Sequence, residues 1–159
     1  GASDITIDCS DGINDILRPS VCAPELAEYP CGLALQQEIC RWWKNETNLS
    51  PPEGLLGNGS QQLLYLVHKL LVGPASRVLG YTPQYSSYCS DMLFCGGRYR
   101  GVKAGDNYCF DAQGLVRELS FEDTLVYLDT PNNPTGQVIP MEQLEAIVQA
   151  AEQKSVCVN

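Results

Sequence analysis

The sequence predicts an α/β fold: a doubly wound, mostly parallel sheet whose strands are joined by crossover helices. Short apolar runs rich in β-branched and aromatic residues alternate along the chain with longer stretches in which apolar residues recur at helical spacing. Parallel strands need long connections to return in the same direction, and the predicted helices supply them. The alternation therefore favours a sheet covered by helices.

The composition is that of one globular domain with a buried core. The chain has 159 residues, of which 44% are hydrophobic and 18% charged. Its formal charge is -9 and its basic residues are scattered along the sequence, so we expect no binding to nucleic acid or to anionic membranes. No apolar run approaches the roughly 20 residues of a membrane helix, and the first residues do not resemble a signal peptide. We expect a cytoplasmic protein.

The eight cysteines are an even number, which in a small secreted protein would suggest disulfides. Several lie in apolar stretches such as residues 156–158, where a free thiol behaves as a small hydrophobic group. No CxxC pair occurs, so a zinc site has little support. Three N-glycosylation sequons, beginning at Asn45, Asn48 and Asn58, would matter only in a secreted protein.

The first 30 residues are predicted to form an extended arm, because they contain Pro19, Pro24 and Pro30 and show little periodicity. One short strand is expected within the arm, at residues 5–7. The domain proper is expected to begin at residue 31.

The helices after the arm are predicted from apolar residues that recur every three or four positions. They are expected at residues 33–44, 60–71, 85–92 and 141–153, with a short helix after Asp111. A polar, proline-ended break is expected at residues 45–52. His68, within the second helix, is expected to be structural.

The strands are predicted from short apolar runs bounded by polar or glycine residues. The clearest is residues 125–128, and others are expected at residues 77–81, 93–102 and from residue 156. Because the last strand begins just before the sequence stops at Asn159, we expect the natural chain to continue.

Residues 55–62, LLGNGSQQ, form the first candidate binding motif. Glycines let a backbone approach a ligand closely, and Ser60 at a helix start offers a hydroxyl and unpaired N–H groups to a phosphate. The alternative is a tight turn in which Ser60 caps the helix. A dinucleotide site is not expected, because Gln62 replaces the third glycine of GxGxxG and no acidic residue follows about 20 positions on.

The second candidate motif, residues 129–136, has the sequence DTPNNPTG and follows the predicted strand 125–128. In open parallel sheets, ligands bind beyond the carboxyl ends of the strands, although Asn-Pro and Thr-Gly are also common in plain turns. The string PNNPTG resembles the signature loop of class I/II aminotransferases, which are fold-type I enzymes that use pyridoxal phosphate. The chain is most similar to the branch with histidinol-phosphate aminotransferase and threonine-phosphate decarboxylase.

The resemblance runs over essentially the whole chain and implies several site residues. It assigns the backbone of Gly59, Ser60 and Gln61 to the phosphate of the cofactor. Residues 83–88, PQYSSY, resemble a family motif whose aromatic residue, here Tyr85, stacks on the pyridine ring.

Two further roles follow from the same resemblance. Asn133 matches an asparagine that donates a hydrogen bond to the phenolic oxygen of the cofactor. Tyr29 matches a tyrosine that reaches the cofactor phosphate of the other subunit, so a homodimer is expected. The sequence departs from the family at Gln62, where an acidic residue is common, and at Gln84, where the family has threonine.

The activity implied by the resemblance is transfer of an amino group between an amino acid and a 2-oxo acid. One alternative is decarboxylation of a phosphorylated amino acid on the same scaffold, and another is a non-catalytic binding protein. Residues 31–159 would form the first half of the cofactor-binding large domain. No catalytic residue is expected within the chain, because the lysine, aspartate and arginine of the family would lie at or beyond its end.

Overall fold

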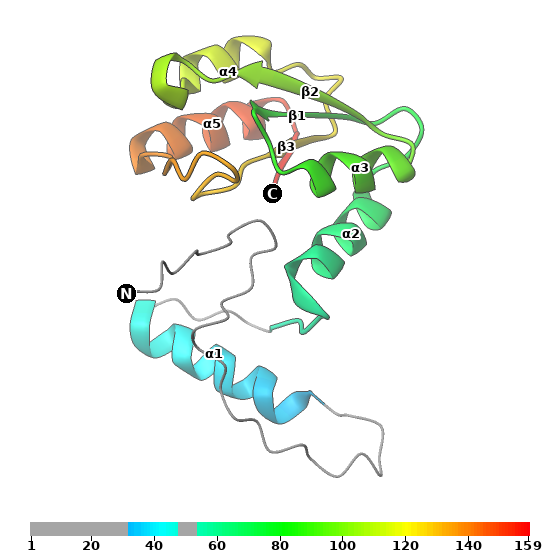
Figure 1. Cartoon of the computed structure of the whole chain (residues 1–159), viewed down its shortest axis with the longest axis vertical. Coiled ribbons are helices and arrows are strands. Elements are labelled where there is room, and N and C mark those ends of the chain that lie inside the picture. Colours follow the sequence, from blue (N-terminus) through cyan, green and yellow to red (C-terminus); the bar gives the residue numbers. More distant parts are fainter. Residues whose placement is uncertain (1–31, 48–53) are drawn as a thin grey trace, which may run out of the picture. The chain divides into compact units, whose positions relative to one another are not determined.

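The computed structural model describes residues 32–47 and 54–159, which belong to two compact units, one ending at Gly54 and one running from Leu55 to Asn159 (Figure 1). The first unit contains helix α1 (Leu33–Thr47). The predicted helix is thus confirmed, but it continues to Thr47, whose hydroxyl donates a hydrogen bond to the carbonyl of Trp43 (2.6 Å). The predicted arm with its strand, and Tyr29 within it, lie outside the described residues.

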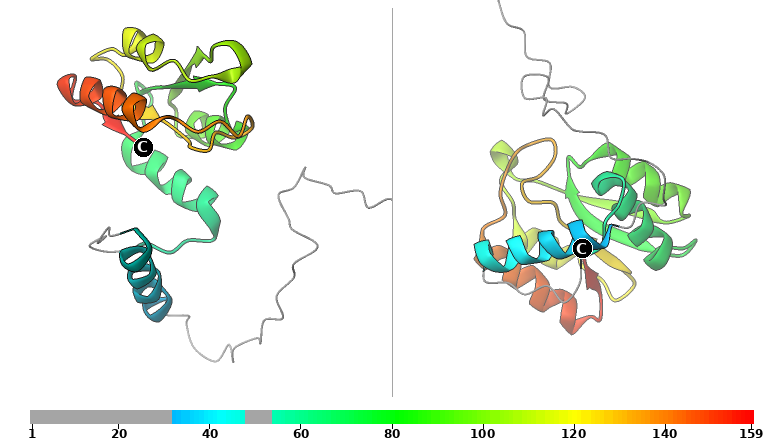
Figure 2. Two further views of the ribbon diagram at one scale, coloured as in Figure 1. Left: turned by 90° about the vertical axis from the view of Figure 1, so that its left-hand side faces the viewer. Right: turned by 90° about the horizontal axis from the view of Figure 1, so that it is seen from below.

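The second unit is a four-stranded sheet with helices on both faces (Figures 1 and 2). Its elements are, in order, α2 (Gly59–Leu71), β1 (Arg77–Thr82), α3 (Ser86–Phe94), β2 (Arg98–Lys103), the 3-10 helix η1 (Asp106–Tyr108), α4 (Ala112–Glu118), β3 (Leu125–Tyr127), α5 (Met141–Gln153) and β4 (Cys157–Val158). The strand order is β2-β1-β3-β4, and every neighbouring pair is parallel. The predicted α/β fold with crossover helices is confirmed.

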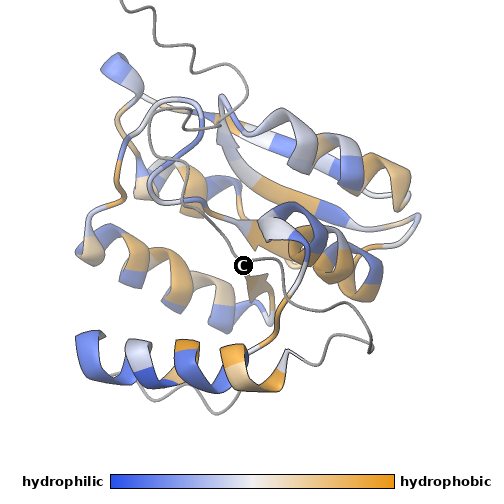
Figure 3. Cartoon of the chain, turned by 60° about the horizontal axis from the view of Figure 1, so that its bottom comes forward, coloured by the Kyte–Doolittle hydropathy of each residue, from blue (hydrophilic) through white to orange (hydrophobic). Residues whose placement is uncertain are grey.

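Alternate residues of the central strands fill two separate cores, one on each face of the sheet. Val78 and Leu125 pack with Tyr88 of α3 on one face. Leu79 and Val126 pack with helices α4 and α5 on the other. In Figure 3 the helices carry both apolar and polar positions. This pattern is that of helices which each cover one side of a buried sheet.

The prediction of an extended segment over residues 93–102 is wrong in its first half. Leu93 and Phe94 end helix α3, and strand β2 begins only at Arg98. The helix is terminated by Gly96, which has a positive φ of 88°, and the N–H of Gly97 donates to the carbonyl of Met92 (3.1 Å). The apolar pair suggested a strand, but both side chains are exposed.

Two findings bear on membrane and thiol chemistry. Within residues 32–47 and 54–159, no helix combines the length and the apolar character that crossing a membrane requires. Five cysteines lie in these ranges, and all of them are free thiols: Cys40, Cys89, Cys95, Cys109 and Cys157.

Gly80 of β1 lies where no side chain fits. A Cβ atom at this position would approach the carbonyl oxygen of Tyr127 to 2.8 Å and would also meet the hydroxyl of Tyr99. We expect Gly80→Ala to lower the free energy of unfolding by about 2–3 kcal/mol, because the clash falls on backbone in the centre of the sheet. Urea unfolding followed by circular dichroism would measure this loss. Gly73→Ala is the matched control, since a Cβ there meets nothing within 4 Å.

His68 of α2 is fully buried, as a structural histidine should be. Its ring contacts the ring of Tyr88 edge to face, with centroids 4.3 Å apart. Neither ring nitrogen has a hydrogen-bond partner within the described residues. Burial lowers the pKa of His68 below its ordinary value of 6.5, and the charge of Asp91 opposes this only in part.

The lowered pKa of His68 predicts that stability falls in mild acid. The unfolded chain binds a proton near pH 6.5, whereas the folded chain resists it, so stability is full above that pH and is lost as the pH falls toward the folded pKa. We expect urea midpoints to drop between about pH 7.5 and about pH 5.5, and to drop less in His68→Phe. An equal drop in the variant would contradict this assignment.

Candidate functional site

The site lies where the strand order reverses. The connection from β1 through α3 leads to β2 on one side, and the next connection, through α4, returns to β3 on the other side of β1. The carboxyl ends of β1 and β3 therefore flank a point from which connections diverge. In open α/β sheets, ligands bind at such switch points.

One carboxylate joins the two loops at this point. Asp129, which follows β3, accepts hydrogen bonds from Gln84 Nε2 (3.2 Å) and from Asn132 Nδ2 (2.9 Å) at Oδ1. Its Oδ2 accepts from the backbone N–H of Asn133 (2.8 Å). Since Gln84 belongs to the loop after β1, Asp129 fixes both loops relative to each other.

Asn132 and Asn133 have different surroundings although they are neighbours in the sequence. Asn132 is 4% exposed, and its side chain also donates to the carbonyl of Pro83 (3.4 Å) and accepts from the hydroxyl of Thr135 (2.6 Å). Asn133 is exposed, and its side-chain amide has no hydrogen-bond partner in the described part of the chain. The side chain of Asn132 thus holds the shape of the loop, and the amide of Asn133 stays exposed. The peptide bond before Pro134 is cis.

Tyr85 lies on the other loop, immediately before helix α3. It is half-buried and packs at the margin of the core around Tyr88. Its backbone N–H donates to Oε1 of Gln84 (2.6 Å), the residue whose amide nitrogen bonds Asp129. Tyr85 and Asn133 therefore belong to loops that one hydrogen-bond network connects.

The first turn of α2 contains the predicted phosphate residues. Gly59 begins the helix with a φ of 80°, a conformation that favours glycine. The N-cap is Asn58 rather than Ser60, and its side chain makes no capping bond. The N–H of Gly59 donates to the carbonyl of Gly57 (2.8 Å), whereas the N–H groups of Ser60 and Gln61 have no partner within the described residues. Ser60 is exposed, and the side-chain amide of Gln61 donates to Asp91 of α3.

This turn is not joined to the Asn133 loop in the described residues. No hydrogen bond or ion pair there links Gly59, Ser60 or Gln61 to residues 129–136, and Figures 1 and 2 show α2 running from α3 away from the sheet toward its first turn. The loops of Tyr85 and Asn133 are thus connected, and the cofactor roles of these two residues and of Gly59, Ser60 and Gln61 stay predictions.

Several buried tyrosines pack in the part of the sheet that leads into the two loops. The ring of Tyr127, at the end of β3, stacks on Tyr88 with centroids 3.4 Å apart. Burial, together with the nearby charge of Asp129, raises the pKa of Tyr127 to about 12. The hydroxyl of Tyr99 donates to the carbonyl of Tyr81 (2.6 Å), and burial raises its pKa as well. These phenols therefore remain neutral at physiological pH.

Sequence reasoning did not identify Asp129 or Asn132 as the residues that organise the site. The signal was present, because an aspartate directly after a strand and an asparagine before proline both form local side-chain hydrogen bonds. Their bonds to Gln84 and Pro83, however, depend on β1 and β3 being neighbours, and this is a property of the sheet order.

Comparison with known proteins gives a consistent result. Residues 25–158 match the family model for aminotransferase class I and II. The histidinol-phosphate aminotransferase of Bacillus licheniformis is 29% identical over 131 residues, which cover 80% of this chain and 34% of that protein. The enzyme of the same name from Paenarthrobacter aurescens is 37% identical over 111 residues, or 65% of this chain and 28% of that protein.

Solved structures share the fold. N-succinyldiaminopimelate aminotransferase from Mycobacterium tuberculosis superposes with a TM-score of 0.76 at 26% identity, over 84% of this chain and 37% of that one. Aspartate aminotransferase from Thermus thermophilus gives a TM-score of 0.69 at 25% identity, over 76% and 32%. This chain spans about a third of the length of the curated relatives it matches. Since the family model covers most of its residues, the chain belongs to the aminotransferase class I and II family.

Proposed function

We propose that the protein acts as an aminotransferase that moves an amino group between an amino acid and a 2-oxo acid with pyridoxal phosphate as cofactor. Members of the family depend on this cofactor. The observation that carries the proposal is the Asp129 network, which holds the loops of Tyr85 and Asn133 together at the switch point of the sheet.

The described residues fit the cofactor. A flat phosphorylated pyridine ring needs an aromatic face, a donor for its phenolic oxygen and N–H groups for its phosphate. Tyr85 supplies an aromatic ring, and Asn133 supplies an amide without another partner among the described residues. In the first turn of α2, which begins at Gly59, the N–H groups of Ser60 and Gln61 would supply the donors for the phosphate.

Each of these residues would bind or orient rather than transfer protons. The amide of Asn133 would donate to the phenolic oxygen, and the ring of Tyr85 would hold the pyridine plane. When bound, pyridoxal phosphate supplies an electron-poor ring that takes up the electron pair left when a bond at the α-carbon of the amino acid breaks. The lysine, aspartate and arginine that complete such a site are proposed to lie outside these residues.

Assembly and location are part of the proposal. We infer a cytoplasmic homodimer in which Tyr29 reaches the cofactor phosphate of the other subunit. The support for this is the resemblance of residues 29 and 30, Tyr-Pro, to the corresponding part of the family. The same proposal assigns residues 1–30 to an arm and residues 31–159 to the first half of the large domain.

Asn133→Ala tests the assignment in the full-length protein. A hydrogen bond to a charged group contributes about 1.5–3 kcal/mol, so we expect the variant to bind the cofactor roughly 10- to 150-fold more weakly. Binding is followed by the visible absorbance of added pyridoxal phosphate, and activity by amino transfer to 2-oxoglutarate. Gln113→Ala, on the exposed side of α4, removes an amide elsewhere and should change neither.

The same experiment contains the outcome that would defeat the proposal. Borohydride reduction of the full-length protein with pyridoxal phosphate should attach the cofactor to a lysine. If no colour and no attached label appear, the protein does not use this cofactor. Colour and label without any amino transfer would instead favour the decarboxylase or binding alternatives.

A further inference from the structure

Three arginines gather at the end of the sheet opposite the loops of Tyr85 and Asn133. Arg77 is the first residue of β1 and pairs with Arg98, the first residue of β2, while Arg100 pairs with Leu79. Paired residues, and residues two apart on a strand, share a face of a sheet. All three side chains therefore lie on the face covered by α4 and α5, where Leu79 is buried.

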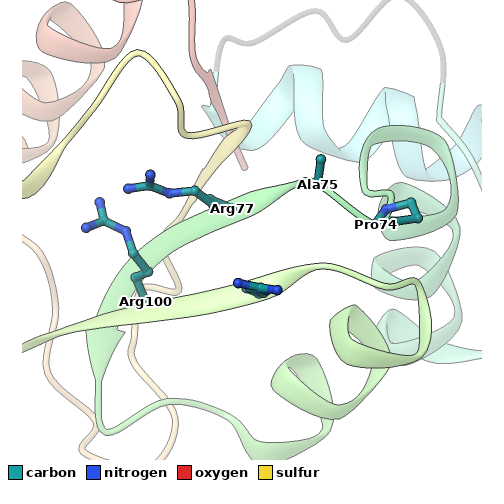
Figure 4. A pocket seen from close by; sticks show the side chains of 5 residues that line it. Pro74, Ala75, Arg77 and Arg100 are labelled. Carbon is teal, nitrogen blue, oxygen red and sulfur yellow. The ribbon is translucent and has the colours of Figure 1, made fainter.

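These side chains line a pocket of about 430 Å³ (Figure 4). Pro74 and Ala75, in the turn before β1, complete its wall. The volume lies within the range of about 300–1,000 Å³ that is typical of small-molecule sites. Because β1 has six residues at about 3.3 Å each, the pocket lies about 20 Å from the loop of Tyr85.

Two of the three arginines are paired with a buried carboxylate, and the third is not. Asp123, whose side chain is fully buried, lies 3.3 Å from Nε of Arg77 and 3.0 Å from Nη2 of Arg100. It anchors these two guanidinium groups on one side. Arg98 is exposed and forms no ion pair within the described ranges, so its charge is uncompensated.

The remaining acidic groups near the pocket are exposed. Glu122 pairs with Arg77 and is 74% exposed, and Glu118 lies 3.8 Å from Arg100 and is 60% exposed. Exposed ion pairs of this kind contribute little, about 0–1 kcal/mol. These two carboxylates would compete with an incoming anion for Arg77 and Arg100. In addition, the buried Nε of Arg100 has no hydrogen-bond partner among the described residues.

We propose that the pocket of Arg77, Arg98 and Arg100 binds a small oxyanion, either a phosphate group or a carboxylate. Guanidinium groups bind both anions through paired N–H donors, and each carries five such donors. Three of them line one pocket, and Arg98, which has no ion pair within the described residues, keeps its guanidinium donors open to a ligand. The site is independent of the proposed cofactor residues, because it lies at the amino ends of the strands.

The test is a titration of the ¹⁵N-labelled full chain with inorganic phosphate and, separately, with succinate at constant ionic strength. We expect saturable shifts of the backbone amides of Ala75, Arg77 and Arg98. Whichever anion saturates at the lower concentration identifies the class of ligand. If neither anion gives saturable shifts at these amides, the proposal is wrong.

Three variants with small risk to folding sharpen the test. Arg98→Gln should weaken anion binding about tenfold, since its charge is the uncompensated one. Glu122→Gln should strengthen it about threefold, because a competing carboxylate is removed from Arg77. Arg117→Gln, on the exposed side of α4, makes the same change of charge outside the pocket and should have no effect. Equal weakening by Arg98→Gln and Arg117→Gln would show a general charge effect and overturn the site.

Discussion

Asp129→Ala is expected to weaken cofactor binding by more than 100-fold in the full-length protein, which is the largest functional effect of any substitution proposed. The variant removes one acceptor from Gln84, one from the buried side chain of Asn132 and one from the N–H of Asn133. Three lost hydrogen bonds of about 1 kcal/mol each correspond to about 3 kcal/mol. Both loops of the site would then be free to move relative to each other.

The measurement is the dissociation constant for pyridoxal phosphate, together with the urea midpoint of the same protein. The binding loss should exceed that of Asn133→Ala, because Asn133 itself is mispositioned and Tyr85 loses its connection through Gln84. Asp106→Ala removes an exposed carboxylate of η1 and serves as control. If Asp129→Ala bound the cofactor as well as the control, the network would not position the site.

Most of the fold was predictable because its signals are local. Helical spacing identified α2 and α5, and the run of residues 125–128 identified β3, each within about two residues of its observed bounds. Errors occurred where local pattern and tertiary context disagree. Leu93 and Phe94 are apolar yet exposed, and only the left-handed Gly96 marks the end of their helix.

Only those site residues that belong to a recognisable sequence motif could be predicted. Asn133 and Tyr85 were named from family strings, and their loops do meet. The organising role of Asp129 required knowing that β3 lies beside β1. The arginine pocket was missed for the same reason. Arg77 and Arg98 are far apart in the sequence, and only the parallel pairing of β1 with β2 makes them neighbours.

Tyr88→Ala is expected to cause the largest loss of stability. Tyr88 is fully buried in α3, contacts the ring of His68 in α2 and stacks on Tyr127 of β3. Truncating a buried aromatic residue costs about 3–5 kcal/mol, because a cavity remains and the lost contacts are not replaced. Since domains are stable by only about 5–15 kcal/mol, this substitution should bring the second unit close to unfolding.

The comparison with Tyr88→Phe separates the contribution of the ring from that of the hydroxyl, which is buried and has no hydrogen-bond partner within the described residues. Phenylalanine keeps the ring that His68 and Tyr127 contact, so we expect a loss of less than about 1.5 kcal/mol. Urea unfolding and hydrogen exchange of α2 amides would measure both variants. Equal losses would mean that the hydroxyl, rather than the ring, stabilises this core. Because Tyr127 directly precedes the loop of Asp129, a loss confined to Tyr88→Ala would also tie the order of that loop, and hence of Asn133, to the packing of one aromatic ring.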